Sequence, residues 1–201
     1  MEEYTAAFGE FLKRDISILV NNVGYFAPST FSPYIDYFAK LPFDEIRREM
    51  KINMLPIAIL TRLFLDPMKT REHRSGIINV GSGAAMTCYA GTAHYSATKK
   101  FIDFFSQSVG YECSDRVDFL LVRPYVVSTT MTHNVQAFYT TTVDKCAKAI
   151  VDSLGTKDYC YGPFIHNLQG VGSEFFHQEF VSRAFTSLII HFGKLYNAVR
   201  K

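Results

Sequence analysis

Three short, largely apolar runs, at residues 16–20, 76–80 and 117–122, do most to limit how this chain folds. The first two are typical of strands that are buried in a parallel sheet, the first of them on both faces, and the third is a strand that Pro124 ends. Between the runs, residues 42–68 and 94–111 carry apolar side chains at helical spacing, and further helices are predicted at residues 2–13, 142–154 and 173–200. Strands that alternate with such helices indicate βαβ units, so we expect an α/β fold with a doubly wound parallel sheet.

The composition narrows the classes of function. The chain has 201 residues, of which 48% are hydrophobic, and this suits one globular domain. The net charge is only +2 and no long basic block occurs, so nothing favours nucleic-acid binding. The four cysteines are scattered, without a Cys-x-x-Cys pair or zinc spacing, which favours an intracellular protein with reduced thiols and no metal site. No stretch approaches the ~20 apolar residues of a membrane span, so we expect no transmembrane anchor in this chain.

Tyr95 and Lys99 lie four residues apart in the predicted helix 94–111. This spacing places both side chains on one helix face. A tyrosine phenol ordinarily titrates near ~10, and a neighbouring ammonium group lowers that pKa, so the pair is a candidate acid/base unit. Taken alone, the pair is better explained as a surface lysine beside a half-buried tyrosine.

Polar residues follow each of the three predicted strands. "NNVG" (Asn21 to Gly24) follows the first, Ser82 the second, and "RPYVVST" the third. Ligands of parallel α/β sheets bind beyond the carboxyl ends of the strands, so we expect these segments to converge on one crevice. Asn53 lies mid-helix, three residues before Pro56, where we expect a kink that leaves a backbone carbonyl free for water. The alternative for Asn53 is an ordinary exposed polar residue.

These elements resemble, in order and spacing, the short-chain dehydrogenase/reductase superfamily, through "NNVG", "KINM", "INVGS", "YSATK" and "RPYVVST". Within it the chain is most similar to the 17β-hydroxysteroid dehydrogenase and very-long-chain 3-oxoacyl-CoA reductase group, through "YSATKKFIDFFSQ", "PYVVST" and "LGTKDYCYGPFIHNLQG". The resemblance implies a Rossmann-like sheet and an oxidoreductase that moves a hydride between a nicotinamide cofactor and a ketone or alcohol.

The resemblance also implies a role for each matched residue. Tyr95 would exchange a proton with the substrate oxygen, and Lys99 would hold the nicotinamide ribose and lower the pKa of the phenol. Ser82 would orient the substrate carbonyl and stabilise developing negative charge. Asn53 would hold a water that relays protons to the lysine.

The cofactor side of the site is implied in the same way. Asn21, Asn22 and Gly24 would lie beside the adenosine half of the cofactor, and Thr129 would contact the nicotinamide carboxamide. The resemblance favours NADP(H) over NAD(H).

The family's phosphate-binding turn, Thr-Gly-x-x-x-Gly-x-Gly, does not occur in this sequence. Gly81/Gly83 and Gly170/Gly172 are the nearest approaches, and neither pair continues with the required glycines. Compared with the family, we expect the first three strands to be absent, so that the run 16–20 becomes an apolar edge. Residues 1–172 would then form a truncated catalytic domain, and residues 173–201 an amphipathic helical segment.

Three hypotheses about function stay open. In the first, the chain is the catalytic part of a reductase whose N-terminal half is lost, and it is weakly active or inactive alone. In the second, it is a binding or scaffold subunit that no longer binds nucleotide, and in the third a second chain restores the missing half. The loops rich in aromatic residues suit an apolar substrate, but they are explained equally well as side chains that anchor the loops to the core. The resemblance implies that the substrate is a fatty 3-oxoacyl-CoA or a steroid.

The segment 173–201 either packs on the domain or on a dimer partner, or lies on a membrane surface. The resemblance implies a homodimer at the endoplasmic reticulum membrane.

Overall fold

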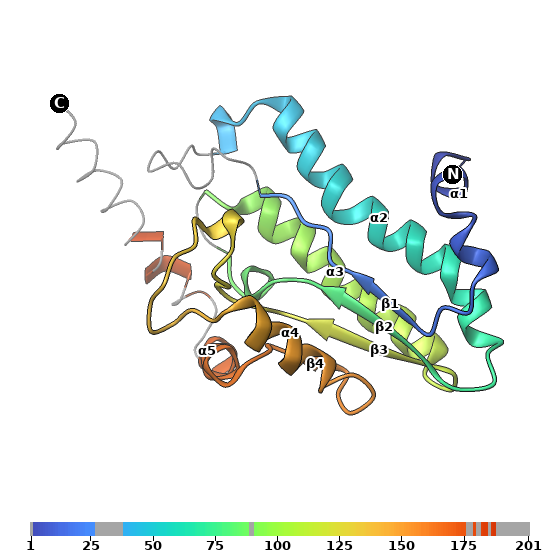
Figure 1. Ribbon diagram of the computed structural model, residues 1–201. Helices are drawn as coiled ribbons and strands as arrows, with labels where there is room; N and C mark the ends of the chain where they lie inside the picture. The colour runs from blue at the N-terminus through green and yellow to red at the C-terminus, as the bar shows by residue number, and fades with distance from the viewer. Residues whose placement is uncertain are drawn as a thin grey trace.

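The computed structural model describes residues 2–26, 38–88, 91–175, 179, 182–184, 186 and 187. In this part of the chain a four-stranded parallel sheet has the strand order β1-β2-β3-β4, with helices on both faces, which confirms the expected α/β fold (Figure 1). The elements, in chain order, are α1 (Glu2–Phe8), the 3-10 turn η1 (Phe11–Lys13), β1 (Ile18–Asn21), η3 (Phe38–Lys40), α2 (Phe43–Lys69), β2 (Ser75–Val80), η4 (Gly83–Ala85), α3 (Ala93–Cys113), β3 (Val117–Val122), η5 (Thr130–Thr132), α4 (Val143–Val151), β4 (Tyr159–Cys160) and α5 (Phe164–Phe175).

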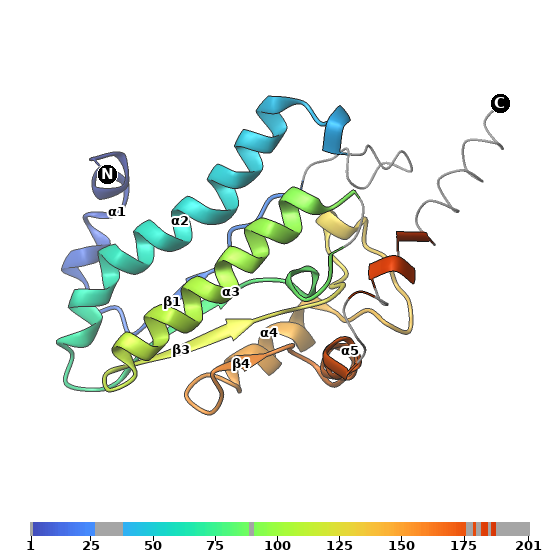
Figure 2. The same cartoon turned by 180° about the vertical axis from the view of Figure 1, so that it is seen from behind.

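Helices α2 and α3 pack side by side on one face of the sheet, and α4 lies on the other (Figures 1 and 2). The alternation of side chains along β2 creates this arrangement, because successive residues of a strand point to opposite faces. Ile77 belongs to the core cluster that includes Phe64 and Met68 of α2. Its neighbour Ile78 belongs to a separate cluster, against which Ile150 of α4 packs.

Strand β1 is the exposed edge of the sheet. Its register pairs Val20 with Ile78 of β2, and no other strand pairs with it in the part of the chain that the structure describes. The side chains of Ile18 and Val20 are 49% and 53% exposed. The expected apolar edge is therefore present, whereas the expectation that this run is buried on both faces is wrong. Helix α4 packs on this face of the sheet against Ile78 of β2, while Ile18 and Val20 at the edge stay exposed.

Helices α2, α3 and α4 follow the predicted ranges closely, whereas the helix predicted at residues 2–13 is α1 followed by the 3-10 turn η1. Helix α2 is one continuous helix through Pro56 and Pro67, and it begins with Asp44 and Glu45 in its first turn, where negative charge is favourable. Helix α4 begins after Thr142, whose hydroxyl accepts a hydrogen bond from the backbone N–H of Lys145 at 3.4 Å.

Residues 158–172, for which the sequence predicts no clear structure, contain the short strand β4 and most of α5. Helix α5 continues past residue 172, where the sequence suggested that the catalytic domain ends. Most of the segment 173–201, and with it the question of an amphipathic helix there, lies outside the described residues. Among the helices that the structure describes, none is both long enough and apolar enough to cross a membrane.

Candidate active site

A pocket of about 590 Å³ opens at the carboxyl ends of the first three strands. Its walls come from the three segments that follow β1, β2 and β3, together with the first turns of α3, so the segments expected to converge do so. The lining residues are Asn22, Gly24, Phe26, Val80, Gly81, Ser82, Ala84, Thr92, Tyr95, Lys99, Pro124, Tyr125, Val126, Val127, Thr129, Thr130, Met131 and Thr132.

The side chain of Lys99 is buried and lines this pocket. It projects from α3, the residue is only 4% exposed, and the ammonium nitrogen donates a hydrogen bond to the carbonyl of Val80 at 3.3 Å. The same nitrogen lies 5.8 Å from the centre of the Tyr95 ring. Burial lowers the pKa of Lys99 to about 8, because the charged form loses its hydration. This lysine therefore titrates close to neutral pH.

Tyr95 lies one helical turn before Lys99, and Phe26 packs edge-on against its ring with the ring centres 4.4 Å apart. Burial raises the pKa of the Tyr95 phenol, and a hydrogen bond with Ser82 acts in the opposite direction. The sequence led us to expect a lowered pKa from the neighbouring lysine. Here desolvation outweighs the other influences, so the phenol keeps its proton at neutral pH.

Ser82 directly follows the end of β2 and caps the turn η4. Its hydroxyl oxygen accepts a hydrogen bond from the backbone N–H of Ala84 at 3.1 Å, which fixes the side chain beside the phenol of Tyr95. The structure thus brings Ser82, Tyr95 and Lys99 together at one wall of the pocket.

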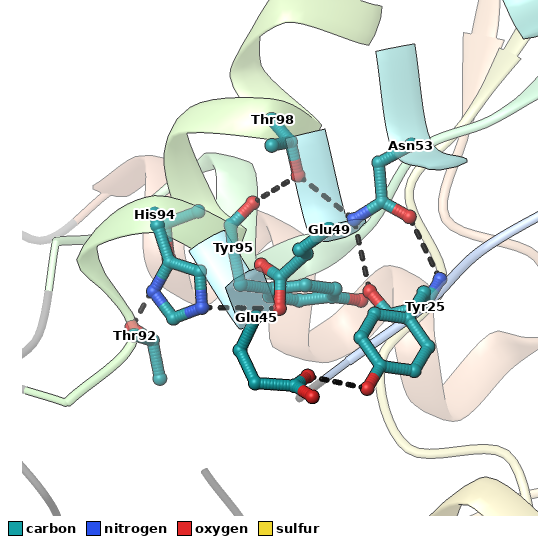
Figure 3. Close-up of polar contacts among 9 residues, drawn as sticks. Tyr25, Glu45, Glu49, Asn53, Thr92, His94, Tyr95 and Thr98 are labelled. Carbon is teal, nitrogen blue, oxygen red and sulfur yellow. Dashed lines mark hydrogen bonds and ion pairs between the residues drawn. The ribbon is translucent and has the colours of Figure 1, made fainter. Parts of the chain in front are cut away.

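Asn53 is fully buried in α2 and clamps two neighbouring elements (Figure 3). Its side-chain oxygen accepts a hydrogen bond from the N–H of Tyr25 at 2.7 Å, and its amide nitrogen donates to the carbonyl of Tyr25 at 2.9 Å and to the hydroxyl of Thr98 at 3.0 Å. Both amide hydrogens are used within the protein, so a relay water would bind either to a lone pair of this oxygen or to a backbone carbonyl that Pro56 leaves without its helical N–H partner. That water stays a prediction.

The two asparagines at the end of β1 point to different places. Asn21 is buried under α2, where its amide nitrogen donates to the side-chain oxygen of Asn79 at 2.8 Å and to the hydroxyl of Thr61 at 3.2 Å. Asn22 and Gly24, in contrast, line the pocket. Asn21 therefore ties the sheet to α2, and it does not face the space that a ligand would fill.

The two Gly-x-Gly pairs of the sequence do not form a phosphate-binding turn. The N–H of Gly81 donates to the carbonyl of Val122 at 2.7 Å, and that of Gly83 donates to the carbonyl of Pro124 at 2.9 Å. Gly170 and Gly172 lie inside α5. None of these N–H groups is arranged to cradle a phosphate.

The sequence did not point to two buried pairs near the site. The imidazole Nε2 of His94 lies 3.1 Å from a carboxylate oxygen of Glu49, and both side chains are almost completely buried (Figure 3). About two helical turns after Tyr95 on α3, Asp103 pairs with the guanidinium of Arg123 at 3.0 Å. The one feature of the sequence that could have placed Glu49 near the site is its position one helical turn before Asn53.

A parallel α/β sheet with a pocket at its strand ends is the architecture of the doubly wound, nucleotide-binding class. The profile described as short chain dehydrogenase matches residues 1–140, and the chain belongs to this family.

The chain is 34% identical over 164 residues to the human very-long-chain 3-oxoacyl-CoA reductase, a match that covers 78% of this chain and 49% of the reductase. It is 31% identical over 120 residues to the human inactive hydroxysteroid dehydrogenase-like protein 1, covering 59% of this chain and 34% of that protein. The chain thus spans half the length of these curated relatives or less. A crystal structure of a short chain dehydrogenase from Burkholderia cenocepacia in complex with NADP has the same fold, with a TM-score of 0.74 at 24% identity over 90% of this chain and 73% of that one.

Proposed function

We propose that this chain carries the proton-transfer and substrate side of an NAD(P)(H)-dependent oxidoreductase, which interconverts a ketone and an alcohol on a lipid-like substrate. The observation that carries the proposal is the meeting of Ser82, Tyr95 and Lys99 at one wall of a largely apolar pocket. A phenol, a hydroxyl and an ammonium group around one cavity suit proton transfer to a substrate oxygen.

In the reducing direction, the protonated phenol of Tyr95 donates its proton to the substrate oxygen. The hydroxyl of Ser82, hydrogen-bonded to that phenol, directs the substrate oxygen toward the proton and stabilises its developing negative charge. Lys99, with its pKa near 8, supplies positive charge behind the phenol and returns a proton to it. A nicotinamide cofactor, when bound, supplies or accepts the hydride.

The residues that are present fit one end of such a cofactor. Gly24 faces Lys99 closely enough that a side chain on Gly24 would begin 3.4 Å from the ammonium nitrogen, so the glycine keeps that approach open. Asn22 and Thr129 line the same pocket. No Thr-Gly-x-x-x-Gly-x-Gly turn occurs in the sequence, so we expect this chain alone to bind the nucleotide weakly.

The walls of the pocket support an apolar substrate. Phe26, Val126, Val127 and Met131 present hydrocarbon surface beside the polar wall. Together with the names of the relatives, this favours a fatty 3-oxoacyl-CoA or a steroid ketone. A location at the endoplasmic reticulum membrane, a homodimer and a preference for NADP(H) belong to the same proposal.

A second function is a binding or scaffold subunit that no longer catalyses. The exposed edge and face of β1, with Ile18 and Val20, favour this alternative because an unpaired apolar edge is a surface on which another chain docks. One relative carries the word inactive in its name.

Calorimetric titration of the purified chain with NADPH and with NADH tests the proposal, followed by turnover assays with a 3-oxoacyl-CoA and a steroid ketone. We expect weak binding, and slow turnover that Tyr95→Phe abolishes while nucleotide binding persists. Turnover that survives Tyr95→Phe would overturn the role of the phenol. Tight NADPH binding would contradict the expected weakness. Neither binding nor turnover, with a stoichiometric partner found on purification, would favour the scaffold subunit.

A further inference from the structure

Glu49 and His94 form a buried pair directly behind the candidate site. Glu49 lies on α2, one helical turn before Asn53, and His94 lies on α3, immediately before Tyr95. The side chains are 0% and 4% exposed, and the oxygen and nitrogen that face each other are 3.1 Å apart (Figure 3). A carboxylate is costly to bury, so one that lies next to a pocket needs a physical reason.

The charge of Glu49 acts on both titratable groups of the pocket. It raises the pKa of Tyr95 in addition to the effect of burial, and it raises the pKa of Lys99 against the lowering effect of burial. A negative charge at this position therefore favours the proton-bound form of each group.

His94 holds this carboxylate without cancelling its charge. Burial lowers the pKa of His94, so its imidazole is neutral at neutral pH. A neutral imidazole whose Nε2 lies 3.1 Å from an ionised Glu49 leaves the pair with a net charge of −1. With Glu49 ionised, the pair carries a negative charge in a region of low dielectric constant, where its influence on nearby groups is strong.

We propose that Glu49 is a positioning residue of this site: its carboxylate, paired with His94 behind the pocket, keeps the ammonium group of Lys99 and the phenol of Tyr95 protonated. The inference rests on the proposed function for its consequence in turnover, because a protonated phenol is the form that donates a proton to a ketone.

The remaining charges around the pair are engaged with one another. On α2, Glu45 accepts a hydrogen bond from the hydroxyl of Tyr25 at 2.6 Å and pairs with Arg48 at 3.5 Å. On α3, Lys100 pairs with Asp103 at 3.7 Å. The centre of the Phe38 ring lies 6.4 Å from that of His94, and Thr92 lies beside the imidazole of His94 (Figure 3).

Titration of Lys99 by NMR tests the inference without cofactor or substrate, so a chain that turns out to lack activity still gives an answer. Protein labelled with 13C at the lysine Cε carbons is titrated, with the Lys99 signal assigned by Lys99→Arg. We expect the pKa of Lys99 to be near 8 in the native chain and lower in Glu49→Gln. The matched control is Glu45→Gln, which makes the same change of charge one helical turn earlier and should leave the pKa of Lys99 in place.

An unchanged pKa of Lys99 in Glu49→Gln, or an equal shift in Glu45→Gln, would overturn the inference. A second measurement needs no variant: with 13C at the glutamate Cδ carbons, the Glu49 carboxyl must be ionised throughout the titration of Lys99, and protonation in that range would also overturn it. Where turnover is measurable, the pH profile of kcat should move to lower pH in Glu49→Gln and stay in place in Glu45→Gln. A structural role alone would lower kcat without moving the profile.

Discussion

Gly83→Ala should destabilise the protein through one contact that the structure defines. Gly83 begins the turn η4 beside Ser82, and a Cβ added there would lie 2.7, 2.8 and 2.9 Å from three ring atoms of Tyr125. The ring is held in place because the hydroxyl of Tyr125 lies 2.7 Å from that of Ser173. Gly83 is not among the described residues with positive φ, so backbone strain adds nothing. Forcing a methyl group into a packed site costs about 1–3 kcal/mol.

Thermal and urea denaturation measure this cost. For a chain of this size, 1–3 kcal/mol corresponds to a fall in Tm of roughly 2–12 °C. In a Tyr125→Leu background the ring atoms are gone, so Gly83→Ala should cost little, and the double-mutant cycle should give a coupling energy of about 1–3 kcal/mol. Gly172→Ala is the control, because a Cβ there meets nothing within 4 Å. Equal costs of Gly83→Ala in the two backgrounds would refute the assigned contact.

Three further outcomes follow from the same structure. The pKa of Lys99 is about 8 in the folded protein and 10.5 ordinarily, so the unfolded chain binds more protons between these two pH values. The free energy of unfolding should therefore rise by roughly 3 kcal/mol as the pH increases from about 8 to 10.5. Urea titrations measure this rise, and Lys99→Met should lack it. Asp103→Ala should lower the free energy of unfolding by about 3–5 kcal/mol, because it leaves the buried guanidinium of Arg123 without a counter-charge. As a control, Asp152→Ala breaks an exposed ion pair and should cost less than about 1 kcal/mol. Thr142→Ala removes the cap of α4 and should cost about 0.5–2 kcal/mol, which urea denaturation measures.

The strands and long helices were predictable because their patterns are local. An apolar run such as residues 76–80 and the helical spacing of α2 need no knowledge of their neighbours. The exposure of Ile18 and Val20 depends on what lies beside the strand, and the run itself carries no such information. Helix α5 was missed because Gly170 and Gly172 each lower helix propensity by about 1 kcal/mol. Packing explains Gly170, since the ring of Tyr161 occupies the space that a side chain would need.

The candidate site was partly predictable for the same reason. The spacing of Tyr95 and Lys99 puts them on one helix face, and Ser82 follows a strand end at the expected crevice, while the family resemblance joined the three in one site. The pairing of Glu49 with His94 joins two helices across 45 positions of sequence, and no periodicity marks it. Likewise, adjacent residues of a strand alternate in direction, but the sequence does not say which of two asparagines faces the pocket.

The open edge of β1 has a thermodynamic consequence for the pocket. Asn22 and Gly24 continue directly from the strand whose outer hydrogen-bonding groups lack a described strand partner, and a Cβ on Gly24 would lie 3.4 Å from the ammonium nitrogen of Lys99. If pairing at this edge shifts Gly24 relative to Lys99, assembly along the edge and occupancy of the pocket are linked equilibria, and each then changes the affinity of the other by the same factor.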